Sequence, residues 1–113
     1  MEVNILYVVS NLGRCGPTNQ LLNIIRNLDP EVFQPTVITL SPEPRDSLKY
    51  RYEELGIDVQ SLGMSRVKGL FKSKEILRQR IKKIAPSVIH TQGIRADSLL
   101  SKLKLQTPWV WLL

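Results

Sequence analysis

A short loop, Gly13-Arg14-Cys15-Gly16, combines residue types that can bind a negatively charged ligand. Glycines let backbone N–H groups approach a ligand closely, and the positive end of a following helix attracts anions. Arg14 adds a mobile positive charge. The loop is therefore a candidate anion site, although two glycines also suffice for a plain tight turn. It is neither a phosphate loop ending in Gly-Lys-Ser/Thr nor a GxGxxG dinucleotide loop.

A second polar segment, His90-Thr91-Gln92-Gly93, follows an apolar run late in the chain. A lone histidine in such a place is either a structural group or a ligand contact. Gln92 shares the face of His90 if the strand continues, and Gly93 lets the backbone approach a substrate. The sequence contains no paired carboxylates, Ser-His-Asp set or metal-ligand spacing. We therefore assign no catalytic residue and expect neither a metal nor another cofactor.

Residues 66–83 carry a net charge of +7 and the rest of the chain carries −1, which gives the net charge of +6. Leu77, Ile81 and Ile84 follow helical spacing there and must pack inward, so the basic side chains must mostly face solvent. This basic face comprises Lys72, Lys74, Arg78, Arg80, Lys82 and Lys83. It is either a solvated helix surface or a docking face for an anionic membrane.

Short apolar runs alternate with helical spacings along the whole chain, and this alternation predicts the elements that position these residues. Strands are expected at residues 4–10, 35–40, 57–62, 87–91 and 109–113. Helices are expected from Gly16-Pro17 to Asp29-Pro30 and at residues 47–55, 73–85 and 96–105, with Gly56 ending the second.

Five strands alternating with four helices predict an α/β fold with a doubly wound parallel sheet, a Rossmann- or flavodoxin-like three-layer sandwich of strand order 3-2-1-4-5. In such a sheet, ligands bind outside the carboxyl ends of the strands, where the strand order reverses. For this order the crevice lies between the first and fourth strands, and its loops are residues 11–19 and 91–96. The two polar segments are thus expected at one site.

Composition narrows the class of protein. A chain of 113 residues that is 42% hydrophobic and 23% charged suits one globular domain rather than a disordered protein. No apolar run is long enough to span a membrane, and the N-terminus lacks the basic region of a signal peptide. Cys15 is the only cysteine, so an internal disulfide is excluded. These features predict a cytoplasmic protein.

The opening, ILYVVSNLGRCGPTNQLLNIIRNLDPEVFQPTVITLS, resembles the start of the GT-B-fold glycosyltransferases of family 4, also called group 1. Further on, LGIDV is similar to that family's L-G-I-x-V, and APSVIHTQG is similar to its P-D-V-V-H-T-H-G. The resemblance covers nearly the whole chain. It implies an N-terminal Rossmann-like domain that holds mainly the acceptor, while a second domain holds most of the nucleotide-sugar donor.

The resemblance also implies roles for particular residues. Gly13, Arg14 and Gly16 match the loop that approaches the donor phosphates. His90 and Gly93 match the H-x-H-G motif, where the second histidine, which contacts the sugar, is replaced by Gln92. Cys15 stands where the family's loop has a further glycine. The implied reaction moves a sugar from a nucleotide-sugar to a glycan or lipid-linked acceptor, with retention and without a metal.

The chain stops inside the apolar run WVWLL, which predicts that residues 1–113 form one domain, incomplete at its C-terminal end and inactive alone. The resemblance suits a place in the cytoplasm or on the inner face of the membrane, with peripheral contact to anionic lipid. Two alternatives remain open from the residues. One is a stand-alone flavodoxin-like binding module, and the other is a nucleic-acid binder using the basic face. We expect no nucleic acid, because Phe71 is the only aromatic residue in that segment.

Overall fold

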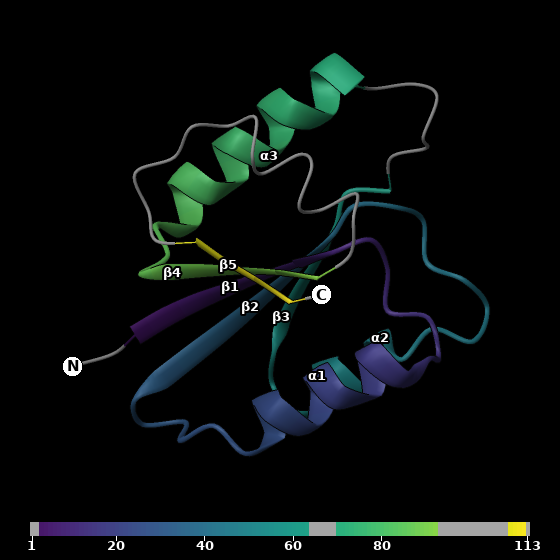
Figure 1. The fold of residues 1–113 in the computed structure, drawn as a ribbon, viewed down its shortest axis with the longest axis vertical. Coiled ribbons are helices and arrows are strands. Elements are labelled where there is room, and N and C mark those ends of the chain that lie inside the picture. Colours follow the sequence, from purple (N-terminus) through teal and green to yellow (C-terminus); the bar gives the residue numbers. More distant parts are fainter. Residues whose placement is uncertain (1–2, 64–69, 93–108, 113) are drawn as a thin grey trace.

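The computed structural model describes residues 3–63, 70–92 and 109–112 (Figure 1). Strands and helices alternate along this part of the chain, as the hydrophobic pattern predicts. Their bounds are β1 (Val3–Val9), α1 (Gly16–Arg26), β2 (Phe33–Thr39), α2 (Lys49–Glu54), β3 (Asp58–Ser61), α3 (Leu70–Ile84), β4 (Val88–Gln92) and β5 (Trp109–Leu112).

The strands form one open sheet in the order β3-β2-β1-β4-β5, and every neighbouring pair is parallel. The predicted α/β class and parallel sheet are therefore confirmed, and the arrangement is consistent with a Rossmann-like fold. The described residues contain three helices. The fourth predicted helix, at residues 96–105, lies outside them.

The sheet is the middle layer of the molecule. Figure 1 shows α3 over one face, with α1 and α2 over the other. Buried side chains from β1, β2 and β4, together with Leu40 just after β2, pack against α3. In this cluster the side chains that meet Leu77 and Ile81 are Leu6, Val8, Ile38, Leu40 and Ile89. Ile84 packs against this cluster from the end of α3, so the predicted apolar stripe of this helix is confirmed.

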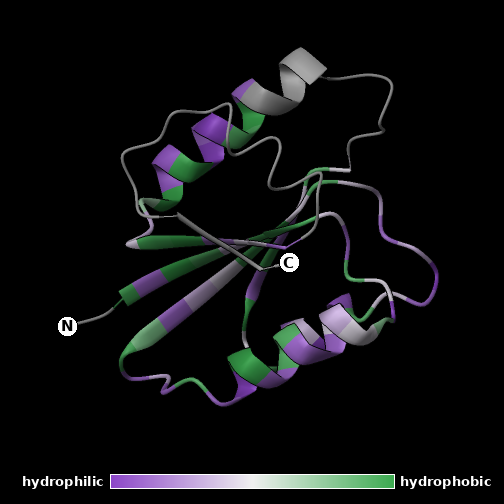
Figure 2. Ribbon diagram, in the orientation of Figure 1, coloured by the Kyte–Doolittle hydropathy of each residue, from purple (hydrophilic) through white to green (hydrophobic). Residues whose placement is uncertain are grey.

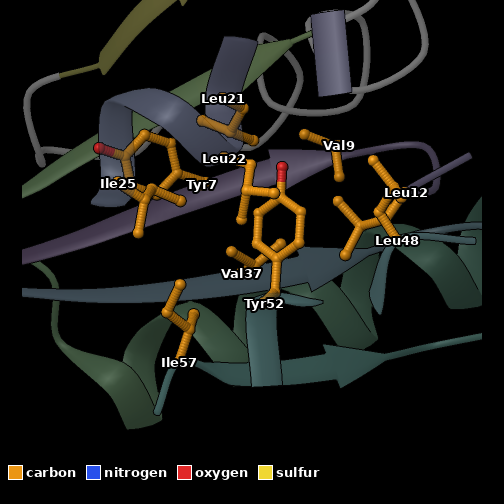
Figure 3. Close-up of a cluster of buried hydrophobic side chains, with 10 residues drawn as sticks. All are labelled: Tyr7, Val9, Leu12, Leu21, Leu22, Ile25, Val37, Leu48, Tyr52 and Ile57. Carbon is orange, nitrogen blue, oxygen red and sulfur yellow. The ribbon is translucent and has the colours of Figure 1, made fainter. Parts of the chain in front are cut away.

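Alternate residues of β1 and β2 belong to a second core on the opposite face, beneath α1 and α2 (Figure 3). Tyr7 and Val9 of β1 and Val37 of β2 contribute to it, together with Leu21 and Leu22 of α1. Because β1 is buried on both faces, its sequence is continuously apolar rather than alternating. Figure 2 shows apolar stretches along the strands and mixed polarity along the helices.

Several element bounds differ from the prediction. Helix α1 ends at Arg26, three residues before Asp29-Pro30, and β2 begins at Phe33, because it already pairs there with Val3. Pro35 is tolerated inside β2 because β3 begins only opposite Thr36, so a single neighbouring strand flanks the proline.

Helices α2 and α3 end in backbone conformations with positive φ. Gly56 follows α2 with a φ of 81°, as expected of a residue that ends a helix. Ala85 follows α3 with a φ of 51°, a left-handed conformation in which a non-glycine residue is strained. Its N–H still donates to the Ile81 carbonyl, and Pro86 then prevents the helix from continuing.

Candidate functional site

The loop after β1 is fixed at Leu12. The Leu12 N–H donates to the two carboxylate oxygens of Glu43, at 3.0 and 3.3 Å, and its carbonyl accepts from the Leu48 N–H at 2.7 Å. The side chain is fully buried in the core beneath α1 and α2. The loop is therefore attached through both its backbone and a side chain to the segment that joins β2 to α2.

Gly13 is a glycine for a steric reason. Its N–H donates to Asn11 Oδ1 at 2.8 Å, and a Cβ at this position would lie 2.9 Å from that same oxygen and 3.3 Å from Cγ of Pro44. The N–H groups of Leu12 and Gly13 are thus both bonded to acceptors of the chain itself. In this conformation they cannot be the donors that bind an external anion.

Gly16 differs from Gly13, because a Cβ built there meets nothing within 4 Å and its φ is not positive. The turn therefore does not require glycine at this position. Gly16 is the first residue of α1, Pro17 follows it, and the Cys15 side chain makes no capping hydrogen bond. Instead, the Cys15 Sγ lies 3.2 Å from the Thr18 Oγ1. The exposed backbone of Gly16 is open to a ligand at the positive end of α1.

Arg14 is exposed and lies on the side of the loop that faces α2. Hydrogen bonding to Arg51 and to Arg14 lowers the pKa of the exposed Tyr50 hydroxyl. Within the described part of the chain, the loop thus contacts the segment between β2 and α2 through Glu43, and α2 through Tyr50. Arg14 is an exposed positive charge two residues before the start of α1.

The polar segment near the end of β4 divides into two parts. Gln92 is the last residue of β4 and pairs with Val9, the last residue of β1. The structure therefore places Gln92 at the carboxyl edge of the sheet, beside the point where the loop begins. Gly93 lies outside the described residues.

His90 lies inside β4, two residues before this edge. It pairs with Tyr7, and the two ring centroids are 5.1 Å apart at an interplanar angle of 40°. Burial lowers the pKa of His90, and its buried Nε2 has no hydrogen-bond partner within the described part of the chain. At neutral pH the imidazole is therefore an uncharged, half-buried group with one unused hydrogen-bonding atom.

The basic face of α3 is only partly free. Arg78 forms an ion pair with Glu75 at 3.4 Å, and Arg80 donates to the Gln60 side chain at 2.9 Å. Lys82 and Lys83 are exposed. Lys72 and Lys74 belong to α3, but their side chains lie outside the described part. None of the helices in that part is long and apolar enough to cross a bilayer.

Sequence reasoning missed two features. One is Glu43, whose signal was the segment Pro42-Glu43-Pro44, where two prolines hold an acidic residue in a restricted backbone. The other is a hollow of about 510 Å³ at the amino end of the strands, lined among others by Ile25, Phe33, Leu55 and Asp58. It lies at the opposite edge of the sheet from Gly16 and Gln92, so it does not belong to the predicted site.

Comparison with protein-family models finds no matching family, and comparison with curated proteins finds no match. The motifs of the sequence and the geometry of the carboxyl edge of the sheet are therefore the observations that bear on function.

Proposed function

We propose that the chain is the acceptor-side domain of a retaining glycosyltransferase of the GT-B type. In this proposal the full enzyme moves a sugar from a nucleotide-sugar to a glycan or lipid-linked acceptor. The donor is held mainly by a second domain, so the 113-residue chain alone does not transfer sugar. The support is the resemblance of its motifs, in order and spacing, to family 4 glycosyltransferases.

One structural observation carries the proposal furthest. Gln92 pairs with Val9 at the carboxyl edge of the sheet, where the order β3-β2-β1-β4-β5 reverses direction. Ligands of open α/β sheets bind outside this edge at the reversal point. The loop that follows β1 and Gln92 of the segment similar to H-x-H-G therefore lie next to each other at the edge where a ligand is expected.

In this proposal some residues bind the charged diphosphate, and others form neutral hydrogen bonds. The Gly16 N–H and the Arg14 guanidinium are suited to the negative charge of the donor diphosphate. Gln92 can donate and accept hydrogen bonds to sugar hydroxyls through its amide but cannot transfer a proton. His90 is suited to a neutral hydrogen bond through Nε2, because burial disfavours its charged form.

The proposed partner surface is the basic face of α3, which would attach the enzyme to anionic lipid. Within this face Lys82 and Lys83 are exposed, and they carry no acidic partner among the described residues. Attachment would be electrostatic, since the apolar stripe of α3 is used in the core. Such an enzyme would work at the cytoplasmic side of a membrane.

The proposal is tested by measuring the affinity of the chain for a panel of nucleoside-diphosphate sugars by calorimetry. We expect weak binding that needs the diphosphate, so the matching nucleosides and free sugars should not bind. Arg14→Gln should weaken it, whereas Arg26→Gln, an equal charge change at the far end of α1, should not. Equal binding of the free nucleosides, or rapid sugar transfer by the chain alone, would contradict the proposal.

A further inference from the structure

The loop after β1 begins from a fixed point that Glu43 creates. The Glu43 carboxylate accepts the Leu12 N–H, and its Oε2 also accepts from the Ser47 hydroxyl at 2.6 Å. The Ser47 Oγ in turn accepts the Lys49 N–H at 3.1 Å, at the start of α2. One half-buried carboxylate therefore connects the loop after β1 to the start of α2.

The donors that bond the Glu43 carboxylate within the described part of the chain are uncharged. Among the described residues, Glu43 forms no ion pair, and its hydrogen bonds come from a backbone amide and a hydroxyl. Hydrogen bonds to a charged acceptor are about twice as strong as neutral ones. The hydrogen bonds thus fix the position of the Glu43 carboxylate. Pro42 and Pro44 on either side restrict the backbone conformations of this segment.

Holding Leu12 also determines where the next residues lie. The Gly13 position is bounded by Pro44, and the Asn11 side chain bonds the Gly13 N–H. Arg14 then leaves the loop beside Tyr50 on α2, and α1 begins at Gly16. Arg14 and Gly16, the two residues that bind the anion in the proposed function, therefore come directly after the residues that Glu43 holds in place.

We propose that Glu43 is a positioning residue, which holds the loop so that Arg14 and the Gly16 amide meet a diphosphate group in a fixed geometry. This inference rests on the proposed function, because it takes the diphosphate from there. It predicts that the affinity for an anion changes in the direction opposite to the one expected from charge alone. Removing a negative charge near an anion site should strengthen anion binding, yet removing the Glu43 side chain should weaken it, because the loop loses its fixed conformation.

The first experiment measures binding of inorganic pyrophosphate, and of nucleoside diphosphates in a parallel arm, well below the melting temperature of each variant. Glu43→Ala should weaken binding about three- to tenfold, since ordering the loop then accompanies binding. Glu43→Gln keeps an acceptor for Leu12 and should bind at least as well as the original chain. Glu53→Ala, the matched loss of charge at an exposed position of α2, should leave binding unchanged or slightly stronger.

Stronger binding by Glu43→Ala would overturn the inference, because it would show that charge alone matters. Tighter binding of nucleoside diphosphates than of pyrophosphate would identify a nucleotide as the source of the diphosphate. If no form of the chain, the original included, binds either probe, the proposed function fails at this loop.

A second experiment tests, in the absence of any ligand, whether Glu43 holds the loop. Amide hydrogen exchange in Glu43→Ala should speed up about tenfold or more at Leu12, with smaller increases at residues 13–16, while amides of β1 and β2 keep their protection. Unchanged exchange at Leu12 would show that Glu43 does not hold the loop. An increase spread evenly over the sheet would mean that the variant is destabilised as a whole, which also contradicts a positioning role.

Discussion

The Tyr52 hydroxyl of α2 donates a buried hydrogen bond of 2.7 Å to the Thr18 carbonyl of α1. In Figure 3 the ring lies among Leu22, Val37 and Leu48, with its hydroxyl end directed toward α1. The bond joins the two helices on one face of the sheet across 34 positions of sequence. It also holds the first turn of α1, from which Gly16 is presented.

Tyr52→Phe should lower the free energy of unfolding by about 1 kcal/mol, because it removes this hydrogen bond without opening a large cavity. Urea denaturation of the variant and of the original chain measures the difference. Tyr50→Phe is the matched control, since Tyr50 is about half exposed, and its effect should stay within about 0.5 kcal/mol. Equal effects of the two substitutions would contradict the buried bond.

The two loop glycines should respond differently to substitution. Gly13→Ala should destabilise the chain by about 1–2 kcal/mol, because the new Cβ displaces the Asn11 oxygen that accepts the Gly13 N–H. Gly16→Val should leave stability nearly unchanged, since the space is open, but should weaken diphosphate binding by covering the amide. Thermal melts together with pyrophosphate titrations measure both. A large loss of stability in Gly16→Val with unchanged binding would assign Gly16 a structural role instead.

His90 should make stability fall in mild acid. Burial lowers its pKa in the folded state below the ordinary value of about 6.5. As the pH falls below that value, the unfolded chain takes up a proton that the folded chain resists, so folding loses free energy. We expect declining stability between about pH 7 and 5.5, and a smaller decline in His90→Gln.

The resonance of this one imidazole provides a direct check, because the chain contains no other histidine. Its titration midpoint, followed by NMR, should lie below about 6.5. A midpoint above that value would mean that a negative charge, not burial, governs the site.

Attachment through the basic face of α3 predicts binding to anionic vesicles that decreases as salt is raised, because the Debye length shortens. Replacing Lys82 and Lys83 together by Gln should weaken co-sedimentation, by roughly 1 kcal/mol for each residue near the surface. The control is the pair Arg26→Gln and Arg51→Gln, the same loss of charge on the helices that cover the opposite face. Equal binding to neutral vesicles would contradict a membrane-docking face.

The parts of the fold that follow from local patterns were predictable from the sequence. The continuous apolar run of β1 indicated a strand buried on both faces, and Gly56 marked the end of α2. Leu77 and Ile81 identified the inward face of α3 before any packing was known. In each case the structure is determined by residues close together in the sequence, through the spacing of apolar side chains or through a backbone conformation that favours glycine.

The details of the candidate site were less predictable because they depend on contacts distant in sequence. The bond between Leu12 and Glu43 spans 31 positions, and no local pattern pairs them. For the same reason, the sequence did not indicate that Arg14 lies beside Tyr50, or that His90 packs on Tyr7 inside the strand. The space around Gly16 also emerges only from tertiary packing, so its glycine resembled a required turn residue.

The proposed site is tested most directly by mapping where a nucleoside-diphosphate sugar perturbs the backbone amides of the labelled chain. The account predicts saturable NMR shifts at Arg14, Gly16 and Gln92, at the carboxyl edge of the sheet, and none around Phe33 and Leu55 at the opposite edge. Shifts confined to that opposite hollow, or absent from Gly16 while the ligand binds, would contradict it.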